Sequence, residues 1–196
     1  MAQLWFGGSF NPIHHAHLVC ARAVAEKMGF EKVVLVPSNQ PPHKPVNEAI
    51  APAKHRLAMC RLAVEGSGLF EVDELEIQRN GASYTIDTVR ELRRRGAGEV
   101  HWMIGADMLQ MLPHWHEPAA LLAETRFVII ARPGWSIDWE TLPPAYHFLQ
   151  EHVVIAPQLE ISATDIRRRV ADGKSIDYLT PNSVVRYIAA NNLYRR

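Results

Sequence analysis

The chain has 196 residues, of which 47% are hydrophobic and 21% charged, a composition typical of a globular domain rather than a disordered segment. Its 21 basic and 21 acidic residues cancel, which argues against a protein that holds nucleic acid through excess positive charge. No apolar run approaches the roughly 18 residues that span a membrane, and the first residues lack the pattern of a signal peptide. Cys20 and Cys60 form no C-x-x-C pair, so we expect reduced thiols on helices of a cytoplasmic protein.

Short strand-like runs alternate with amphipathic helical patterns along the chain. Strands are predicted over residues 3–6, 32–36, 70–77, 100–104, 127–131 and 153–156. Helices are predicted over residues 15–28, 53–65 and 85–95, with two more beyond residue 161. Ser162 is expected to cap the first of these last two, and Thr180 the second, with Pro181 as its first residue. Gly7 and Gly8 are expected to break the first strand.

This alternation of strands and helices predicts the fold class and the domain organisation. It favours an α/β fold, a Rossmann-like doubly wound and mostly parallel sheet with helices on both faces. We expect a single domain over residues 1–196, with a C-terminal helical part, about 162–196, packed on it. Ligands of such sheets bind beyond the carboxyl ends of the strands, so residues that follow each strand are the candidates for function.

The segment after the first strand, residues 7–17, carries the densest set of such candidates. Gly7 and Gly8 allow a ligand to approach the backbone closely, and the helix beginning near His15 directs its first N–H groups at the same space. Both features favour the binding of a phosphate group at this place. The segment is neither G-x-G-x-x-G nor a P-loop, so hydride transfer to NAD and P-loop chemistry lose support.

Two histidines in this segment, His14 and His17, are three residues apart and would share one face of a helical turn. Two imidazoles beside a phosphate can donate hydrogen bonds to transferring phosphoryl oxygens. A plainer interpretation is one helix-capping histidine and one packed histidine. A third is a metal pair that needs another ligand, although neither H-E-x-x-H nor an H-D dipeptide is present. His15 is expected to point away.

Residues 7–17, G-G-S-F-N-P-I-H-H-A-H, resemble the G-G-T-F-D-P-I-H-x-G-H signature of the HxGH nucleotidyltransferase superfamily. Residues 161–167, I-S-A-T-D-I-R, resemble its I-S-S-T-x-I-R motif. Between them, P-P-H-K at 41–44, S-Y-T-I-D-T at 83–88, G-A-D at 105–107 and Trp115 resemble the bacterial nicotinate-mononucleotide adenylyltransferases. The resemblance covers essentially the whole chain. Asn11 and Ala16 depart from it, since Asp and Gly are usual there.

The resemblance implies a reaction between two nucleotides. The 5′-phosphate of nicotinate mononucleotide would attack the α-phosphorus of ATP in line, giving nicotinate adenine dinucleotide and pyrophosphate in NAD biosynthesis. No covalent enzyme intermediate is expected, Mg²⁺ would arrive with ATP, and no metal site of the protein's own is expected. The expected partners are these two substrates, without nucleic acid or membrane, and a homo-oligomer is left open.

The same resemblance assigns roles residue by residue. It gives catalysis to His14, His17 and Arg167. It gives ATP binding to Gly7, Gly8, Ser9, Phe10, His17, Asp107, Ser162, Thr164 and Arg167. It gives mononucleotide binding to Lys44, Tyr84, Thr85, Trp115 and Arg132. The backbone N–H groups at the start of the helix near Tyr84 and Thr85 are expected to select the nicotinate carboxylate.

Each assignment has a plainer alternative. Asp107 and Ser162 could simply cap helices, and Lys44 could be a surface residue. The remaining tryptophans are expected to serve packing: Trp5, Trp102, Trp135 and Trp139. Two other functions also stay open, a metal-dependent phosphohydrolase that uses His14, His17 and Asp107, and a non-catalytic domain that senses nucleotides with the same pocket.

Overall fold

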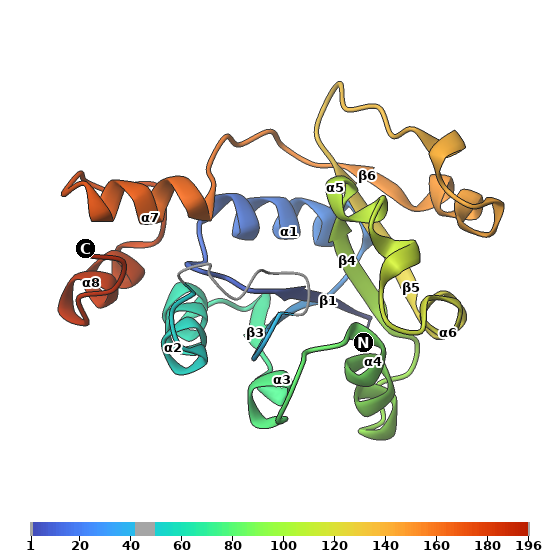
Figure 1. The fold of residues 1–196 in the computed structure, drawn as a ribbon, viewed down its shortest axis with the longest axis horizontal. Coiled ribbons are helices and arrows are strands. Elements are labelled where there is room, and N and C mark those ends of the chain that lie inside the picture. The colour runs from blue at the N-terminus through green and yellow to red at the C-terminus, as the bar shows by residue number, and fades with distance from the viewer. Residues whose placement is uncertain (1, 42–49, 196) are drawn as a thin grey trace.

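The computed structural model describes residues 2–41 and 50–195. Its centre is a six-stranded sheet in which every pair of neighbours is parallel, in the order β3-β2-β1-β4-β5-β6 (Figure 1). The strands are β1 (Gln3–Gly8), β2 (Lys32–Pro37), β3 (Phe70–Val72), β4 (His101–Gly105), β5 (Arg126–Ala131) and β6 (Val153–Ile155). The order reverses between β1 and β4, which is the switch point where doubly wound sheets bind ligands. The predicted fold class is confirmed.

Helices cover both faces of the sheet, with α1 along one face and α4 on the other (Figure 1). The α-helices are α1 (His15–Met28), α2 (Ala53–Val64), α3 (Leu75–Gln78), α4 (Thr85–Arg94), α5 (Ala106–Leu109), α6 (Pro118–Glu124), α7 (Ala163–Ala171) and α8 (Asn182–Ala190). Three 3-10 helices accompany them: η1 (Leu112–His114), η2 (Trp139–Thr141) and η3 (Pro144–His152). Within the described residues, no helix is long and apolar enough to cross a membrane.

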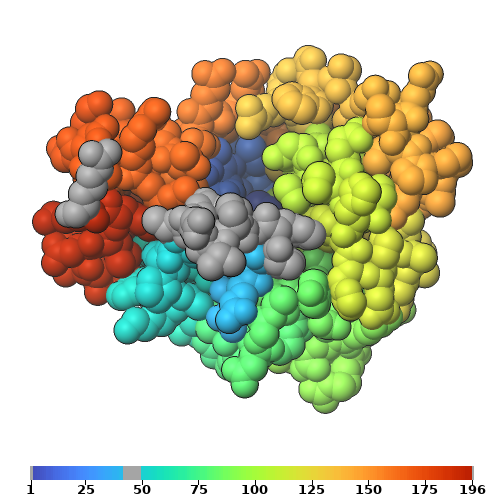
Figure 2. Space-filling view, in the orientation of Figure 1, coloured from blue at the N-terminus to red at the C-terminus, as the bar shows by residue number. Residues whose placement is uncertain are grey.

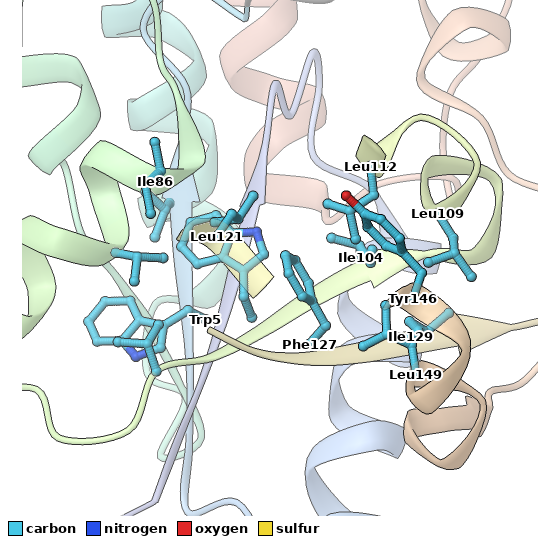
Figure 3. Close-up of a cluster of buried hydrophobic side chains, with 14 of the residues drawn as sticks. Trp5, Ile86, Ile104, Leu109, Leu112, Leu121, Phe127, Ile129, Tyr146 and Leu149 are labelled. Atoms are coloured by element: carbon cyan, nitrogen blue, oxygen red, sulfur yellow. The ribbon is translucent and has the colours of Figure 1, made fainter. Parts of the chain in front are cut away.

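Alternation along the strands divides the core into two clusters, one on each face. Successive strand side chains point to opposite faces, so Leu4 joins one cluster and Trp5 the other. The Leu4 cluster includes buried residues of α1, α2, α7 and α8, among them Ile166 and Val184. The Trp5 cluster is completed by α3 to α6 and η3, and Figure 3 shows several of its members on this face: Ile86, Ile104, Leu121, Phe127, Ile129, Tyr146 and Leu149.

The position of helix α1 is set by an apolar stripe that faces the sheet and by the glycine that ends the helix. Ala21, Val24 and Ala25 recur at helical spacing and are fully buried against the sheet. Gly29 ends the helix in the left-handed conformation, at φ 74°, and its N–H donates to the carbonyl of Ala25. The opposite end of α1 therefore lies at the carboxyl edge of the sheet, next to β1.

The sequence predicted that Gly7 and Gly8 break the first strand, and this prediction is wrong. The strand continues through Gly8, and Gly7 and Gly8 pair with Val36 and Pro37 of β2. A Cβ atom on Gly7 would lie 2.3 Å from the ring of Trp102 on the neighbouring strand. The glycine therefore serves close packing within the sheet at the switch point.

Two further predictions about elements are wrong, and side-chain hydrogen bonds explain both. The strand predicted over 70–77 stops at Val72, because Oδ1 of Asp73 accepts a hydrogen bond from the N–H of Leu75 and starts α3. Thr180 does not cap α8, whose cap is Pro181. The Thr180 hydroxyl instead donates to the carbonyl of Ile13, at 2.7 Å, and ties the start of α8 to the loop before α1.

Candidate active site

Two adjoining pockets open at the carboxyl ends of β1 and β4, on either side of the switch point. The first has a volume of about 490 Å³ and is lined by residues of α1, the segment after β5 and the segment before α7. The second has about 390 Å³ and is lined by the end of β1, the start of α4 and the segment after η1. Phe6 and Gly105 line both. Figure 2 shows a hollow in this face of the molecule, with N-terminal residues (blue) at its base.

The structure brings His14 and His17 together at the first pocket. Their imidazole rings stack with centroids 3.7 Å apart and planes at 21°. His14 is the N-cap of α1, and its backbone N–H donates to Nδ1 of His17 at 3.3 Å. His15 lines neither pocket, and its N–H is already used by the carbonyl of Leu179, at 3.1 Å. That N–H is therefore not a phosphate donor, contrary to the expectation for the start of this helix.

Burial keeps both imidazoles neutral at neutral pH. It lowers the pKa of His14 from 6.5 to about 4, and the nearby charge of His15 acts in the same direction. Burial also lowers the pKa of His17 well below its usual range, with the charge of His14 adding to the effect. Because Nδ1 of His17 accepts a hydrogen bond, the proton of its neutral ring lies on Nε2. His17 is therefore a neutral hydrogen-bond donor.

Phe10 packs against His17 and lines neither pocket. Its side chain is 2% exposed, and its ring meets those of Phe6 and His17 edge-on, with centroids 5.3 and 5.2 Å apart. A Cβ atom on Gly8 would come within 3.1 Å of the same ring. The side chain of Phe10 thus fixes the position of His17, and nothing places it at the ATP pocket where it was expected.

Asp107 and Ser162 both line the first pocket. Asp107 is the second residue of α5, whose N-cap is Gly105, so the alternative that Asp107 caps this helix is wrong. Ser162 does cap its helix, since its Oγ accepts from the N–H of Asp165 at 3.1 Å. Arg132, expected at the mononucleotide, also lines the first pocket.

Arg167 and Thr164 lie just behind this wall, in the first two turns of α7. One guanidinium nitrogen of Arg167, Nη1, donates to the carbonyl of Asn11 at 2.9 Å, and Nη2 donates to Oγ1 of Thr164 at 3.4 Å. The carbonyl of Asn11 belongs to the loop that leads to His14. Residues from opposite ends of the chain, 156 positions apart, are thereby joined beside the histidine pair.

Tyr84, Thr85 and Trp115 line the second pocket, as a group. The segment Gly7, Gly8 and Ser9 lines it too, although the sequence had placed these residues with ATP. Gly7 and Gly8 pair with Val36 and Pro37 of β2, and the residue that follows β2, Ser38, lines the same pocket. Lys44, the last residue expected here, lies outside the described residues.

Arg56 of α2 was missed by the sequence reasoning. It is 1% exposed, and its guanidinium donates to the carbonyls of Ser9, Asn39 and Ala51 at 2.7 to 2.9 Å. It therefore ties the loops after β1 and β2 to the segment before α2. The sequence did contain a signal for its burial, because Arg56 lies three residues before Met59 and so shares the buried face of α2.

Two pocket residues were also missed. Trp135, expected to serve packing, is 52% exposed and stands on the rim of the first pocket. Glu76 is a buried carboxyl group that lines the second pocket and accepts a hydrogen bond from the Thr88 hydroxyl at 2.6 Å. Burial raises the pKa of Glu76, against the lowering effect of hydrogen bonds from Thr88 and Ser83.

Comparisons with known proteins bear on this arrangement. Residues 5–169 match the family model described as cytidylyltransferase-like. A probable nicotinate-nucleotide adenylyltransferase from Roseiflexus sp. strain RS-1 is 41% identical over 191 residues, covering 96% of each chain. Another from Yersinia pestis strain Pestoides F is 42% identical over 209 residues, covering 97% of this chain and 94% of that one. The chain belongs to the nicotinate-nucleotide adenylyltransferase family.

The fold of this nicotinate-nucleotide adenylyltransferase family member is also found in solved structures. Nicotinic acid mononucleotide adenylyltransferase from Plasmodium falciparum, complexed with NaAD, superposes with a TM-score of 0.78 at 20% identity, covering 99% of this chain and 98% of that one. The same enzyme complexed with APC gives a TM-score of 0.75 at 19% identity, covering 98% and 96%. At these identities the likeness supports the fold.

Proposed function

We propose that the protein joins ATP and nicotinate mononucleotide into nicotinate adenine dinucleotide and releases pyrophosphate. The observation that carries this proposal is the pair of adjoining pockets, each within the roughly 300–1,000 Å³ typical of small-molecule sites. They share Phe6 and Gly105 at the switch point, and the two stacked histidines stand beside that junction. Two ligands bound there would present their phosphates to each other.

The chemistry of the walls suggests which substrate enters which pocket. The first pocket combines two imidazoles with Asp107, Arg132 and Ser162, groups suited to a ribose and a polyphosphate. The second combines the aromatic rings of Tyr84 and Trp115 with the start of α4, groups suited to a pyridine ring that carries a carboxylate. We therefore place ATP in the first and the mononucleotide in the second.

In the proposed mechanism the histidines stabilise charge rather than move a proton. The attacking phosphate of the mononucleotide is already anionic, so it needs no general base. The Nε2–H of His17 donates to an oxygen of the α-phosphate as negative charge moves toward the leaving pyrophosphate. His14 orients His17 through its backbone N–H and stacks on it, which reduces reorganisation during the reaction.

The leaving pyrophosphate is stabilised by positive groups around the first pocket. Arg167, held by the Asn11 carbonyl, is placed to reach it from α7. Mg²⁺ bound to ATP would neutralise part of its charge, and such an ion keeps several waters and takes one or two carboxylates. Asp107 is the acidic side chain lining the described part of this pocket and fits that role.

Preference for nicotinate over nicotinamide would come from the backbone at the start of α4. The N–H of Tyr84 donates to the carbonyl of Ala82 at 3.1 Å, so the donors for the carboxylate begin with Thr85. The positive end of the helix dipole favours a negative group at this position. An amide would present its own N–H₂ to these donors and leave them unpaired.

The test is pyrophosphate release from the purified protein over a grid of triphosphates and mononucleotides with Mg²⁺. The proposal requires release that depends on both ATP and nicotinate mononucleotide. Phosphate release from one nucleotide and water would instead identify a phosphohydrolase. Nucleotide binding without any release would identify a sensing domain.

A further inference from the structure

Asn11 is the point where three segments distant in sequence meet beside the proposed site. Its carbonyl accepts the hydrogen bond from Nη1 of Arg167, at 2.9 Å. Its side-chain oxygen Oδ1 accepts from the backbone N–H of Ala51 at 3.1 Å and from the hydroxyl of Tyr194 at 2.8 Å. The Asn11 side chain is 2% exposed, so these bonds form in a largely dry environment.

Tyr194 is held in a conformation that a bulky residue rarely adopts. It follows α8, 183 positions after Asn11, and its backbone has a φ of 63° in the left-handed region. Such a conformation is unfavourable for a bulky residue and persists where surrounding contacts fix it. Phe10, directly before Asn11, has a φ of 43°. Tyr194 itself and the residue that precedes Asn11 therefore both adopt the left-handed conformation.

The hydroxyl of Tyr194 acts as a donor in this contact. Burial raises the pKa of Tyr194 above its ordinary value, so the phenol is protonated and can donate at neutral pH. Oδ1 of Asn11 accepts from two donors at once, which fixes the orientation of the side chain and with it the backbone of the loop. The carbonyl that receives Arg167 belongs to the same residue.

We propose that Tyr194 is a positioning residue for adenylyl transfer. Its hydroxyl fixes Asn11, whose carbonyl orients the guanidinium of Arg167 toward the phosphates. The inference rests on the proposed function. A displacement of about 1 Å far from the reacting atoms can cost on the order of 100-fold in rate, so one distant hydrogen bond can matter for turnover.

The first test is Tyr194→Phe, which removes one oxygen atom and keeps the ring. We expect kcat to fall on the order of 5- to 50-fold, a part of the effect that misplacement can cause. The KM for nicotinate mononucleotide should stay within about twofold, because the second pocket does not contact Arg167. A merely structural role would lower the melting temperature without this split between kcat and KM.

Tyr187→Phe is the matched control. Tyr187 belongs to α8, and its partly buried hydroxyl forms a hydrogen bond with Nδ1 of His55 at 3.0 Å. Neither residue lines either pocket. Each variant loses one hydrogen bond of a hydroxyl group, so both should lower the melting temperature by a similar amount. Tyr187→Phe should retain kcat within about twofold. Equal losses of kcat in the two variants would overturn the proposal.

A double-mutant cycle separates action through Arg167 from a general loss of stability. In an Arg167→Ala background, Tyr194→Phe should lower kcat by less than about twofold, because the group it positions is gone. The same fold-loss in both backgrounds would contradict the proposal, as would a Tyr194→Phe variant that does not fold or that keeps wild-type kcat. Failure of the wild-type protein to release pyrophosphate would instead reject the proposed function.

Discussion

The two pockets at the switch point are assembled in different ways. Most of the second pocket comes from consecutive units between β1 and α6, and its distinctive groups are aromatic rings and the start of one helix. The first requires α1 near one end of the chain and the segment before α7 near the other. Its groups are imidazoles, an arginine and an aspartate.

This difference in assembly suggests a division of roles, with the second pocket selecting the substrate and the first pocket supporting the reaction. A pocket made by neighbouring elements can vary to suit a substrate without disturbing the rest of the fold. The first pocket is fixed by long-range contacts, such as Arg167 to Asn11 and Thr180 to Ile13, so its geometry depends on the whole domain. We therefore expect changes at the first pocket to affect turnover and changes at the second to affect substrate choice.

The largest effect is expected at the histidine pair. His17→Ala removes a preorganised donor and should lower kcat by about 10²–10³-fold, as loss of an oxyanion-hole donor does. His15→Ala, which changes a neighbouring residue outside both pockets, should cost far less. Steady-state kinetics at saturating substrates decide this. A folded His17→Ala protein with near wild-type turnover would remove the histidines from the mechanism.

Arginine and lysine variants sharpen the comparison between the pockets. Arg167→Ala should weaken the use of ATP on the order of 10- to 150-fold, the value of a charge-assisted hydrogen bond. Lys44→Ala should chiefly weaken the use of the mononucleotide. Arg167→Lys should not recover full activity, because a point charge cannot replace a planar fork. Equal changes in both Michaelis constants for either alanine variant would contradict the division.

Substrate choice tests the second pocket by itself. The ratio of kcat/KM for nicotinate over nicotinamide mononucleotide should be at least about tenfold, from a charge-assisted hydrogen bond to backbone donors. Thr85→Ala should reduce that ratio only in part, since the donor is its backbone N–H. A ratio near one would reject this carboxylate site and leave adenylyl transfer in place.

The smallest expected effect is that of pH. Because His14 stays neutral between pH 8 and pH 6, its protonation should not change kcat in that range. Its folded pKa of about 4 lies below the unfolded value of 6.5, so between these two values the unfolded chain binds the proton more readily than the folded one. The free energy of unfolding should therefore fall as the pH drops from 6.5 toward 4. Urea unfolding at several pH values measures this, and His14→Gln should flatten that part of the profile.

Local patterns predicted the strands and helices well where a single signal dominates. The spacing of apolar residues and the stop at Gly29 define α1 with its observed bounds, from His15 to Met28. The prediction failed where a side chain competes for the backbone, as Asp73 does at the end of β3. Gly7 was misread because its role, close packing on Trp102, involves a strand almost a hundred residues away.

The candidate site was predicted as a set of residues but not as an arrangement. Motif resemblance found His14, His17, Tyr84 and Trp115, and the structure groups each pair at its own pocket. It assigned Arg132 to the mononucleotide, whereas Arg132 lines the first pocket, because its position depends on which side of β5 the chain leaves the sheet. Contacts such as Tyr194 to Asn11 leave no local signal in a single sequence.

The central claim is that ATP in one pocket gives its adenylyl group to a phosphate in the other. ATP labelled at the α-phosphorus tests this most directly, with the fate of the label followed by chromatography in the presence and absence of nicotinate mononucleotide. The account predicts that the label appears in the dinucleotide and stays in ATP when the mononucleotide is omitted. Label released as AMP without the mononucleotide, or absent from the dinucleotide when both substrates are present, would contradict it.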